Sequence, residues 1–191
     1  MPIALELLAP AGNAEIGIAA IDHGADAVYI GAPKFSARAQ AGSTADDIAR
    51  LIRHANFWRA KVYVALNTIL TDNELSEALI IIRKIHDLGA DGLIIQDTGL
   101  LELDLPPIPL IASTQMHNDT PEKVRFLEAV GFQRVILARE LSLEEIEDIR
   151  RHTQNIELEA FVHGALCVSY SGQCYMSQAI ANRSGNRGLC A

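Results

Sequence analysis

The feature that most constrains the fold is a regular alternation of short β-rich apolar runs with longer stretches whose apolar residues recur at three- and four-residue spacing. The apolar runs predict strands at Leu5–Leu8, Ala27–Ile30, Lys61–Leu66, Gly92–Ile95, Leu110–Ser113, Arg134–Leu137 and Glu157–Phe161. The longer stretches predict helices at Asn13–His23, Ala45–Trp58, Asp72–Leu88, Pro121–Val130 and Leu143–His152. This order indicates successive βα units around one parallel sheet.

Residues at the helix ends support these boundaries. Hydroxyl side chains that can cap free backbone N–H groups precede several helices, at Thr44, Thr71, Thr120 and Ser142. Glycine follows several helices, at Gly24, Gly89 and Gly131, where it can take the left-handed conformation that ends a helix.

Polar residues follow every predicted strand, and their distribution separates the two architectures that this alternation allows. In chain order they are Asn13, Lys34 with Arg38, Asn67, Gln96 with Asp97, Gln115, Arg139 with Glu140, and His163. A barrel gathers functional groups at the carboxyl ends of all its strands, whereas an open sheet concentrates them at one switch point. The phosphate-binding pattern G-x-G-x-x-G of many open sheets is missing after the first strand. We therefore predict an α/β fold of TIM type, a (β/α)8 barrel.

The length of the chain predicts that this barrel is incomplete. A (β/α)8 barrel usually needs about 250 residues and eight strands. Here 191 residues supply seven predicted strands, so we expect residues 1–191 to form a single barrel domain without its eighth unit, the amino-terminal part of a longer protein. Unpaired edges at the first and last strands favour pairing with a second copy, so a homo-oligomer is expected.

Bulk composition excludes several classes of protein. With 49% hydrophobic and 21% charged residues, the chain can bury a substantial core. It has no basic start leading into a long apolar run, and no apolar run reaches about 18 residues, so neither export nor a membrane location is predicted. Three cysteines are too few for a disulfide scaffold and indicate reduced thiols in the cytoplasm. The net charge of −8 argues against a uniformly basic surface, although residues 160–191 contain no Asp or Glu.

All the cysteines lie in this last part of the chain, residues 160–191, which we call the cysteine segment. Cys167, Cys174 and Cys190 are spaced neither like a zinc knuckle nor like a common ferredoxin run. A cluster or zinc site normally has four ligands, so a fourth has to come from beyond residue 191, from His163, or from substrate or water. Metal ligands, one reactive thiol and inert buried cysteines all remain open on spacing alone.

Glu159–Ser177 resembles the signature of peptidase family U32, the collagenase-like proteases. The matching positions are Glu159, Phe161, Gly164, Cys167, Gly172, Cys174 and Ser177. Further blocks that resemble the family are Leu5–Gly12, Gly24–Gly31, Leu66–Thr68, Ala112–Gln115 and Leu137–Glu140. Within the family, Leu101–Ile108 resembles the branch implicated in forming 5-hydroxycytidine in large-subunit (23S) ribosomal RNA.

The resemblance implies a barrel and a chemistry. Relatives that hydroxylate RNA or ubiquinone without molecular oxygen are associated with a 4Fe–4S cluster on four cysteines, and Cys167, Cys174 and Cys190 match the first three. In the family the fourth lies further along, so this chain alone is expected to lack an intact cluster and to be inactive. RNA-modifying relatives are linked to prephenate, which Lys34, Arg38 or Arg139 can bind near the barrel mouth. The expected partner of the full-length enzyme is ribosomal RNA or its precursor.

Several strand-end residues are candidates for catalysis: His163, Arg139, Glu140, Gln115 and Asn67. Each also has a structural interpretation, as a turn contact, an ion pair or a partner for backbone groups. Tyr170 and Tyr175 are candidates for stacking on a nucleobase, or for core packing.

The alternative function is a peptidase or a peptide-binding barrel without catalysis. His163 with Ser169, Ser171 or Cys167 is the pair of base and nucleophile that it requires. The patterns H-E-x-x-H and G-x-S-x-G are both missing.

Overall fold

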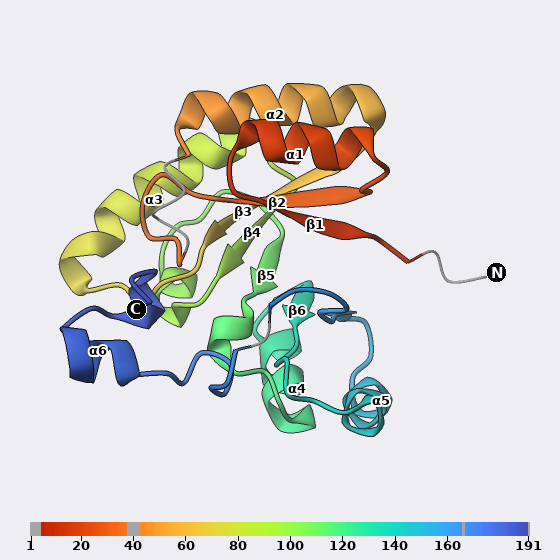
Figure 1. Ribbon diagram of the computed structural model, residues 1–191, viewed down its shortest axis with the longest axis vertical. Helices are drawn as coiled ribbons and strands as arrows, with labels where there is room; N and C mark the ends of the chain where they lie inside the picture. Colours follow the sequence, from red (N-terminus) through yellow and green to blue (C-terminus); the bar gives the residue numbers. More distant parts are fainter. Residues whose placement is uncertain (1–4, 38–42, 166, 191) are drawn as a thin grey trace.

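The computed structural model describes residues 5–37, 43–165 and 167–190 (Figure 1). Seven parallel strands form one sheet in the order of the sequence, from β1 to β7. They are β1 (Leu8–Ala11), β2 (Ala27–Gly31), β3 (Lys61–Leu66), β4 (Gly92–Ile95), β5 (Leu110–Ala112), β6 (Arg134–Ile136) and β7 (Glu157–Glu159). A doubly wound sheet reverses its strand order at a switch point, and this sheet does not. The strands instead curl into a half-barrel, with β1 and β7 at its two edges.

The helices that connect the strands lie on the outside of the half-barrel (Figure 1). They are α1 (Ala14–Asp22), α2 (Ala45–Trp58), α3 (Asp72–Asp87), α4 (Pro121–Ala129) and α5 (Leu143–His152), whereas the short helix α6 (Met176–Ala181) belongs to the cysteine segment. Short 3-10 helices occur at η2 (Thr98–Glu102), η3 (Thr114–Met116) and η4 (Gly185–Arg187). Within the described residues, no helix is long and apolar enough to cross a membrane.

Most predicted boundaries are confirmed within two residues, and those of β3, β4, α2 and α5 agree at both ends. The hydroxyl side chains before α2, α4 and α5 accept hydrogen bonds from backbone N–H groups of the first turn. Gly24, Gly89 and Gly131 all have positive φ after their helices, as predicted. The sequence did not predict α6, a short helix without a side-chain cap.

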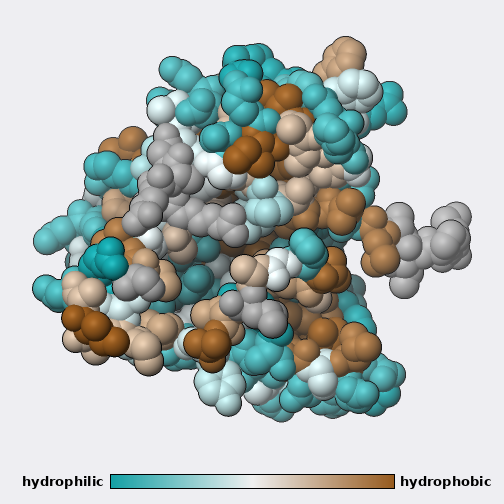
Figure 2. Space-filling model, in the orientation of Figure 1, coloured by the Kyte–Doolittle hydropathy of each residue, from teal (hydrophilic) through white to brown (hydrophobic). Residues whose placement is uncertain are grey.

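The prediction for β1 is wrong by three residues, because pairing with β2 begins at Leu8 opposite Ala27 and continues through Pro10. Pro10 lacks an N–H group, but β1 is an edge strand, where proline is tolerated. Before β1 the chain is exposed: Leu5 is 88% accessible. Figure 2 shows apolar surface at this edge, where the chain runs toward its N-terminus.

The side chains of each strand alternate between two packing environments. The larger core lies between the sheet and the helices and contains, for example, Ile30, Val64 and Ile95. A smaller cluster lines the inner face of the half-barrel, and its buried members are Ala27, Tyr63, Ala65, Ile94, Ile111 and Ile136. This alternation fixes which residues point into the barrel beyond each strand.

A network of charged side chains fills the inner face at the amino ends of the strands. Arg134 of β6 lies at its centre: Nη1 is 2.6 Å from Glu6 Oε1, and Nη2 is 2.6 Å from Glu157 Oε2. Its guanidinium carbon is 5.0 Å from the centroid of the Tyr63 ring, within cation–π range. Glu159 Oε2 is 3.5 Å from Nη1. Burial raises the pKa of Glu159 to about 7, although the positive charge of Arg134 acts to lower it. We call this group the amino-end network.

Candidate functional site at the barrel mouth

A layer of polar side chains lies at the opposite, carboxyl ends of the strands. Asn67, Gln96 and Ser113 each stand two residues beyond a member of the inner apolar cluster, so alternation turns them into the barrel. Asn67 Nδ2 donates to Ser113 Oγ at 3.2 Å, which links the ends of β3 and β5. Gln96 Nε2 donates to the Gln115 carbonyl oxygen at 3.3 Å, which links β4 to the same turn. We call this layer the mouth.

Three buried polar atoms at the mouth lack hydrogen-bond partners among the described residues. They are Gln96 Oε1, Thr68 Oγ1 and Nδ1 of His117. Leaving a buried acceptor unsatisfied costs about 1 to 3 kcal/mol, unless water or a ligand provides the missing hydrogen bond. The mouth therefore offers hydrogen-bonding capacity that the protein itself does not use.

The cysteine segment crosses the mouth, anchored on one side by Ser171 (Figure 1). Ser171 is fully buried, and its Oγ donates to Glu140 Oε2 at 2.8 Å. The same oxygen accepts from the backbone N and from Nε of Arg139, at 3.1 and 3.2 Å. The backbone N of Ser171 donates to Glu140 Oε1 at 3.0 Å. All the hydrogen-bonding capacity of the hydroxyl is used, which holds the segment on the loop after β6.

Two glycines allow the segment to approach the mouth closely. Gly172 has φ of 72°, and a Cβ atom built there lies 2.0 Å from the Gln115 carbonyl oxygen. Gly188 has φ of 81°, and its Cβ would lie 2.7 Å from the Ala37 carbonyl oxygen. A side chain at either position requires the backbone to move.

Arg187 anchors the other side of the segment. Its Nη1 donates to the Ile69 carbonyl oxygen at 3.1 Å and to Glu74 Oε2 at 3.2 Å. Hydrogen bonds from Arg187 and from the Thr71 backbone lower the pKa of Glu74 to about 2. The segment is thus tied to the loop after β3 and to α3 as well as to the loop after β6.

His117, which the sequence analysis did not select, lies between two carboxylates at the mouth. Its Nδ1 is 3.4 Å from Glu140 Oε1, an ion-pair distance that does not meet hydrogen-bond geometry, and its Nε2 is 3.1 Å from Asp119 Oδ2. The ring packs edge-on against Tyr170, with centroids 6.0 Å apart. Burial acts to raise the pKa of Glu140, but the hydrogen bonds from Ser171 outweigh this effect, so the pKa lies below its usual value. An ionised carboxylate beside an imidazole is suited to proton transfer.

The predicted catalytic residues divide into two groups. Arg139, Glu140, Gln115 and Asn67 meet at the mouth, and Asn67 Oδ1 also accepts from the Ala37 backbone N at 3.0 Å. His163 is exposed, and the part of the chain that the structure describes gives it no hydrogen bond or ion pair. The sequence does contain a clue to His117, because it lies two residues after Gln115 and thus close to the carboxyl end of β5.

The predicted anion-binding residues are not all at the mouth. Lys34 Nζ lies 2.6 Å from Glu77 Oε1 of α3, in an exposed ion pair on the outer surface. Arg38 lies outside the described residues. Only Arg139 has described contacts at the mouth.

The cysteines do not form a metal site on their own. Cys167 and Cys190 are exposed, so the interpretation of three inert buried cysteines is wrong, and Cys174 is half-buried. Cys190 Sγ is 3.9 Å from Ser177 Oγ. Among residues 5–37, 43–165 and 167–190, no group of three or more His, Cys, Asp or Glu side chains is arranged to hold a metal ion. The described residues therefore do not fit a 4Fe–4S cluster by themselves.

The comparisons with known proteins point to one family. The family model for peptidase family U32 matches residues 12–191. The chain is 54% identical over 187 residues to the 23S rRNA 5-hydroxycytidine C2501 synthase of Escherichia coli K12, covering 98% of this chain and 28% of that protein. It is 39% identical over 189 residues to the tRNA hydroxylation protein P of the same organism, covering 97% and 42%.

A solved structure supports the fold. The structure of a U32 peptidase aligns with a TM-score of 0.67 at 17% identity, covering 82% of this chain and 68% of that one. The chain spans less than half the length of the two curated relatives, so the activity of a whole protein of that length is a separate question. The family match over residues 12–191 establishes that the chain belongs to peptidase family U32.

Proposed function

We propose that this chain is the barrel of an enzyme that hydroxylates a cytidine of ribosomal RNA without molecular oxygen. The observation that carries the proposal is the 54% identity, over 98% of the chain, to a protein named as a 23S rRNA 5-hydroxycytidine synthase. The mouth supports it, because Gln96 Oε1 is a buried acceptor without a partner in the described residues, as a site that binds a polar base requires.

The residues at the mouth have distinct proposed roles. Asn67 and Gln96 hold the base by hydrogen bonds to its edge. Hydroxylation of a ring carbon is a two-electron oxidation, and its oxygen donor and electron acceptor have to come from a co-substrate or cofactor rather than from the residues at the mouth. These residues are assigned only the proton that leaves the ring carbon, which Glu140 with His117 receives. Ser171 positions both Arg139 and Glu140, because it bonds to each of them.

We propose further that Cys167, Cys174 and Cys190 supply three thiolates to a 4Fe–4S cluster in a protein of the relatives' full length. The support is the resemblance of the signature segment to oxygen-independent hydroxylases. The described geometry does not assemble that site, so no step is assigned to a cluster. Prephenate is the proposed co-substrate, with Arg139 as its cationic contact.

The peptidase alternative has less support from the mouth. A serine nucleophile must be accessible and bonded to a base such as histidine. Ser171 is fully buried and donates its hydroxyl proton to Glu140, while Arg139 occupies its acceptor side.

The test uses the full-length protein in a bacterial strain that lacks its own 23S rRNA C2501 hydroxylation. We expect the wild-type protein to restore 5-hydroxycytidine, measured by mass spectrometry of digested ribosomal RNA. Glu140→Gln should lower this activity at least about 100-fold, the lower end of general acid–base effects. Glu144→Gln on the exposed face of α5 is the matched control and should retain it. Gelatin cleavage by a wild-type protein that restores no 5-hydroxycytidine supports the peptidase instead.

Iron is measured separately, in full-length protein purified without oxygen. Absorbance near about 400 nm that disappears in Cys167→Ala supports the cluster. Hydroxylation by an iron-free protein contradicts it.

A further inference from the structure

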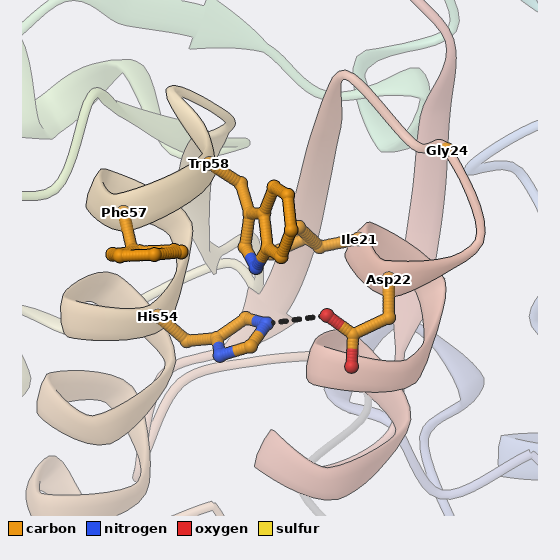
Figure 3. Close-up of a pocket in the computed structure, with 6 residues that line it drawn as sticks. All are labelled: Ile21, Asp22, Gly24, His54, Phe57 and Trp58. Atoms are coloured by element: carbon orange, nitrogen blue, oxygen red, sulfur yellow. Dashed lines mark hydrogen bonds and ion pairs between the residues drawn. The ribbon is translucent and has the colours of Figure 1, made fainter.

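A second candidate binding site lies on the outer surface, away from the mouth. It is a cavity of about 710 Å³ between the carboxyl ends of α1 and α2, lined by Ile21, Asp22, Gly24, His54, Phe57 and Trp58 (Figure 3). In a βα unit the helix returns the chain to the amino end of the next strand, so this cavity and the mouth lie at opposite ends of the half-barrel.

Two large aromatic side chains are exposed beside this cavity. Phe57 is 79% accessible and Trp58 is 58% accessible. Their rings pack edge to face, with centroids 5.3 Å apart. Trp58 stands over the His54–Asp22 pair, whose Nε2 and Oδ1 atoms are 2.7 Å apart (Figure 3). The indole therefore borders this pair while more than half of the residue stays open to solvent.

The stretch of sequence around the aromatic pair is basic on an otherwise acidic protein. Residues 48–71 contain no Asp or Glu, although the whole chain has a net charge of −8 and Asp22 of α1 lines the cavity. Arg53 and Arg59 of this stretch are exposed, and no ion pair involves them among the described residues. Arg59 ends α2 with φ of 59°, a left-handed conformation that glycine usually provides at this position. It places a cation directly after Trp58.

We propose that Arg53, His54, Phe57, Trp58 and Arg59, the aromatic–basic surface, bind a single-stranded stretch of the substrate RNA. This inference rests on the proposed function and adds an anchoring contact remote from the chemistry. A base stacks on Trp58, and the flanking phosphates lie against Arg53 and Arg59. Asp22, the acidic residue that lines the cavity, is paired with His54, whereas Arg53 and Arg59 have no ion pair among the described residues. Unpaired arginines beside exposed aromatic rings suit a partner that is an anion with flat apolar groups, and RNA has both features.

The test measures binding of a fluorescein-labelled oligouridine to the 191-residue chain by fluorescence anisotropy. Trp58 is its only tryptophan, so quenching of tryptophan fluorescence on addition of unlabelled oligouridine reports stacking directly. Trp58→Ala should weaken binding by about 5- to 150-fold, the range for loss of one stacked base. Arg53→Gln should reduce the slope of log affinity against log salt by about 0.7, as for one lost phosphate contact.

Phe126→Ala is the matched control, because Phe126 on α4 is also 58% accessible but lies outside the cavity. It should bind like wild type. Equal affinity of wild type and Trp58→Ala, or no binding by wild type, overturns the inference. Oligomer formation that Trp58→Ala abolishes while RNA binding persists assigns the surface to a second copy and also overturns it. Trp58-dependent RNA binding without hydroxylation by the full-length protein leaves this inference standing and refutes the proposed function alone.

Discussion

The two ends of the half-barrel both hold buried polar groups, but they satisfy them differently. At the amino end, Arg134 is paired with Glu6, Glu157 and Glu159, so its positive charge is matched by groups within the sheet or directly before it. At the mouth, Gln96 Oε1 has no partner among the described residues, and the ion pairs and hydrogen bonds come from turns and from the cysteine segment. The amino end is complete by itself, and the mouth is not.

This difference separates stability from function. In barrel enzymes the carboxyl face carries the active site and the amino face contributes to stability. The amino-end network ties β6 and β7 to the chain before β1, across the gap between the two edges of the sheet. Changes there should affect the unfolding free energy of the whole domain, whereas changes at the mouth should act on the cysteine segment and on activity.

The largest effect is expected from Arg134→Met. It removes the common partner of Glu6, Glu159 and the more exposed Glu157. For the mostly buried Glu6 and Glu159, the loss of one side of a buried ion pair costs about 3 to 5 kcal/mol. Urea unfolding followed by circular dichroism measures the loss. Arg151→Met is the control, because its pair with Glu147 is exposed and worth less than about 1 kcal/mol. Equal losses in the two variants would contradict a special role for the amino-end network.

A second test concerns the pH dependence of the same network. Burial raises the pKa of Glu159 from 4.5 to about 7, so the folded protein holds a proton that the unfolded chain releases. The native state therefore loses stability as pH rises from about 4.5 to about 7, in total about 3 kcal/mol. Glu159→Gln mimics the protonated form, so it should match wild type near pH 4 and exceed it by about that amount at pH 8. If the difference in unfolding free energy between Glu159→Gln and wild type stays constant between these pH values, the pKa of Glu159 is not raised in the folded protein.

Local sequence patterns were sufficient for the elements and for their arrangement. The alternation of periodicities and the polar residue after each strand predicted the barrel class and brought Asn67, Gln115, Arg139 and Glu140 to one end. These are consequences of side-chain alternation, which each short run of sequence contains. The end of β1 was predicted too early because Pro10 resembles a strand terminator unless the strand is known to be at an edge.

Contacts between distant parts of the chain were not predictable in this way. Arg187 bonds to Glu74, 113 residues away, and Lys34 pairs with Glu77 of α3 rather than contributing to the mouth. His117 became a candidate only when the fold placed Glu140 beside it. No periodicity encodes such pairs, because they depend on how completed elements pack.

The smallest loss of global stability is expected from a variant at the mouth. Gly172→Ala adds a Cβ atom 2.0 Å from the Gln115 carbonyl oxygen at a residue with φ of 72°, so the segment has to lift from the mouth. We expect the unfolding free energy to fall by about 1 to 3 kcal/mol, the cost of one strained backbone position. The loss is no larger because the segment can detach locally while the rest of the domain stays folded. Hydrogen exchange should rise around residues 170–175 and 185–189 and stay unchanged in β3 and β4. Gly164→Ala provides the control, because φ there is 144° but nothing lies within 4 Å of the added atom, so strain occurs without a clash. If both variants release the segment equally, close packing on Gln115 does not hold it; if only Gly172→Ala does, the mouth can be opened without unfolding the amino end.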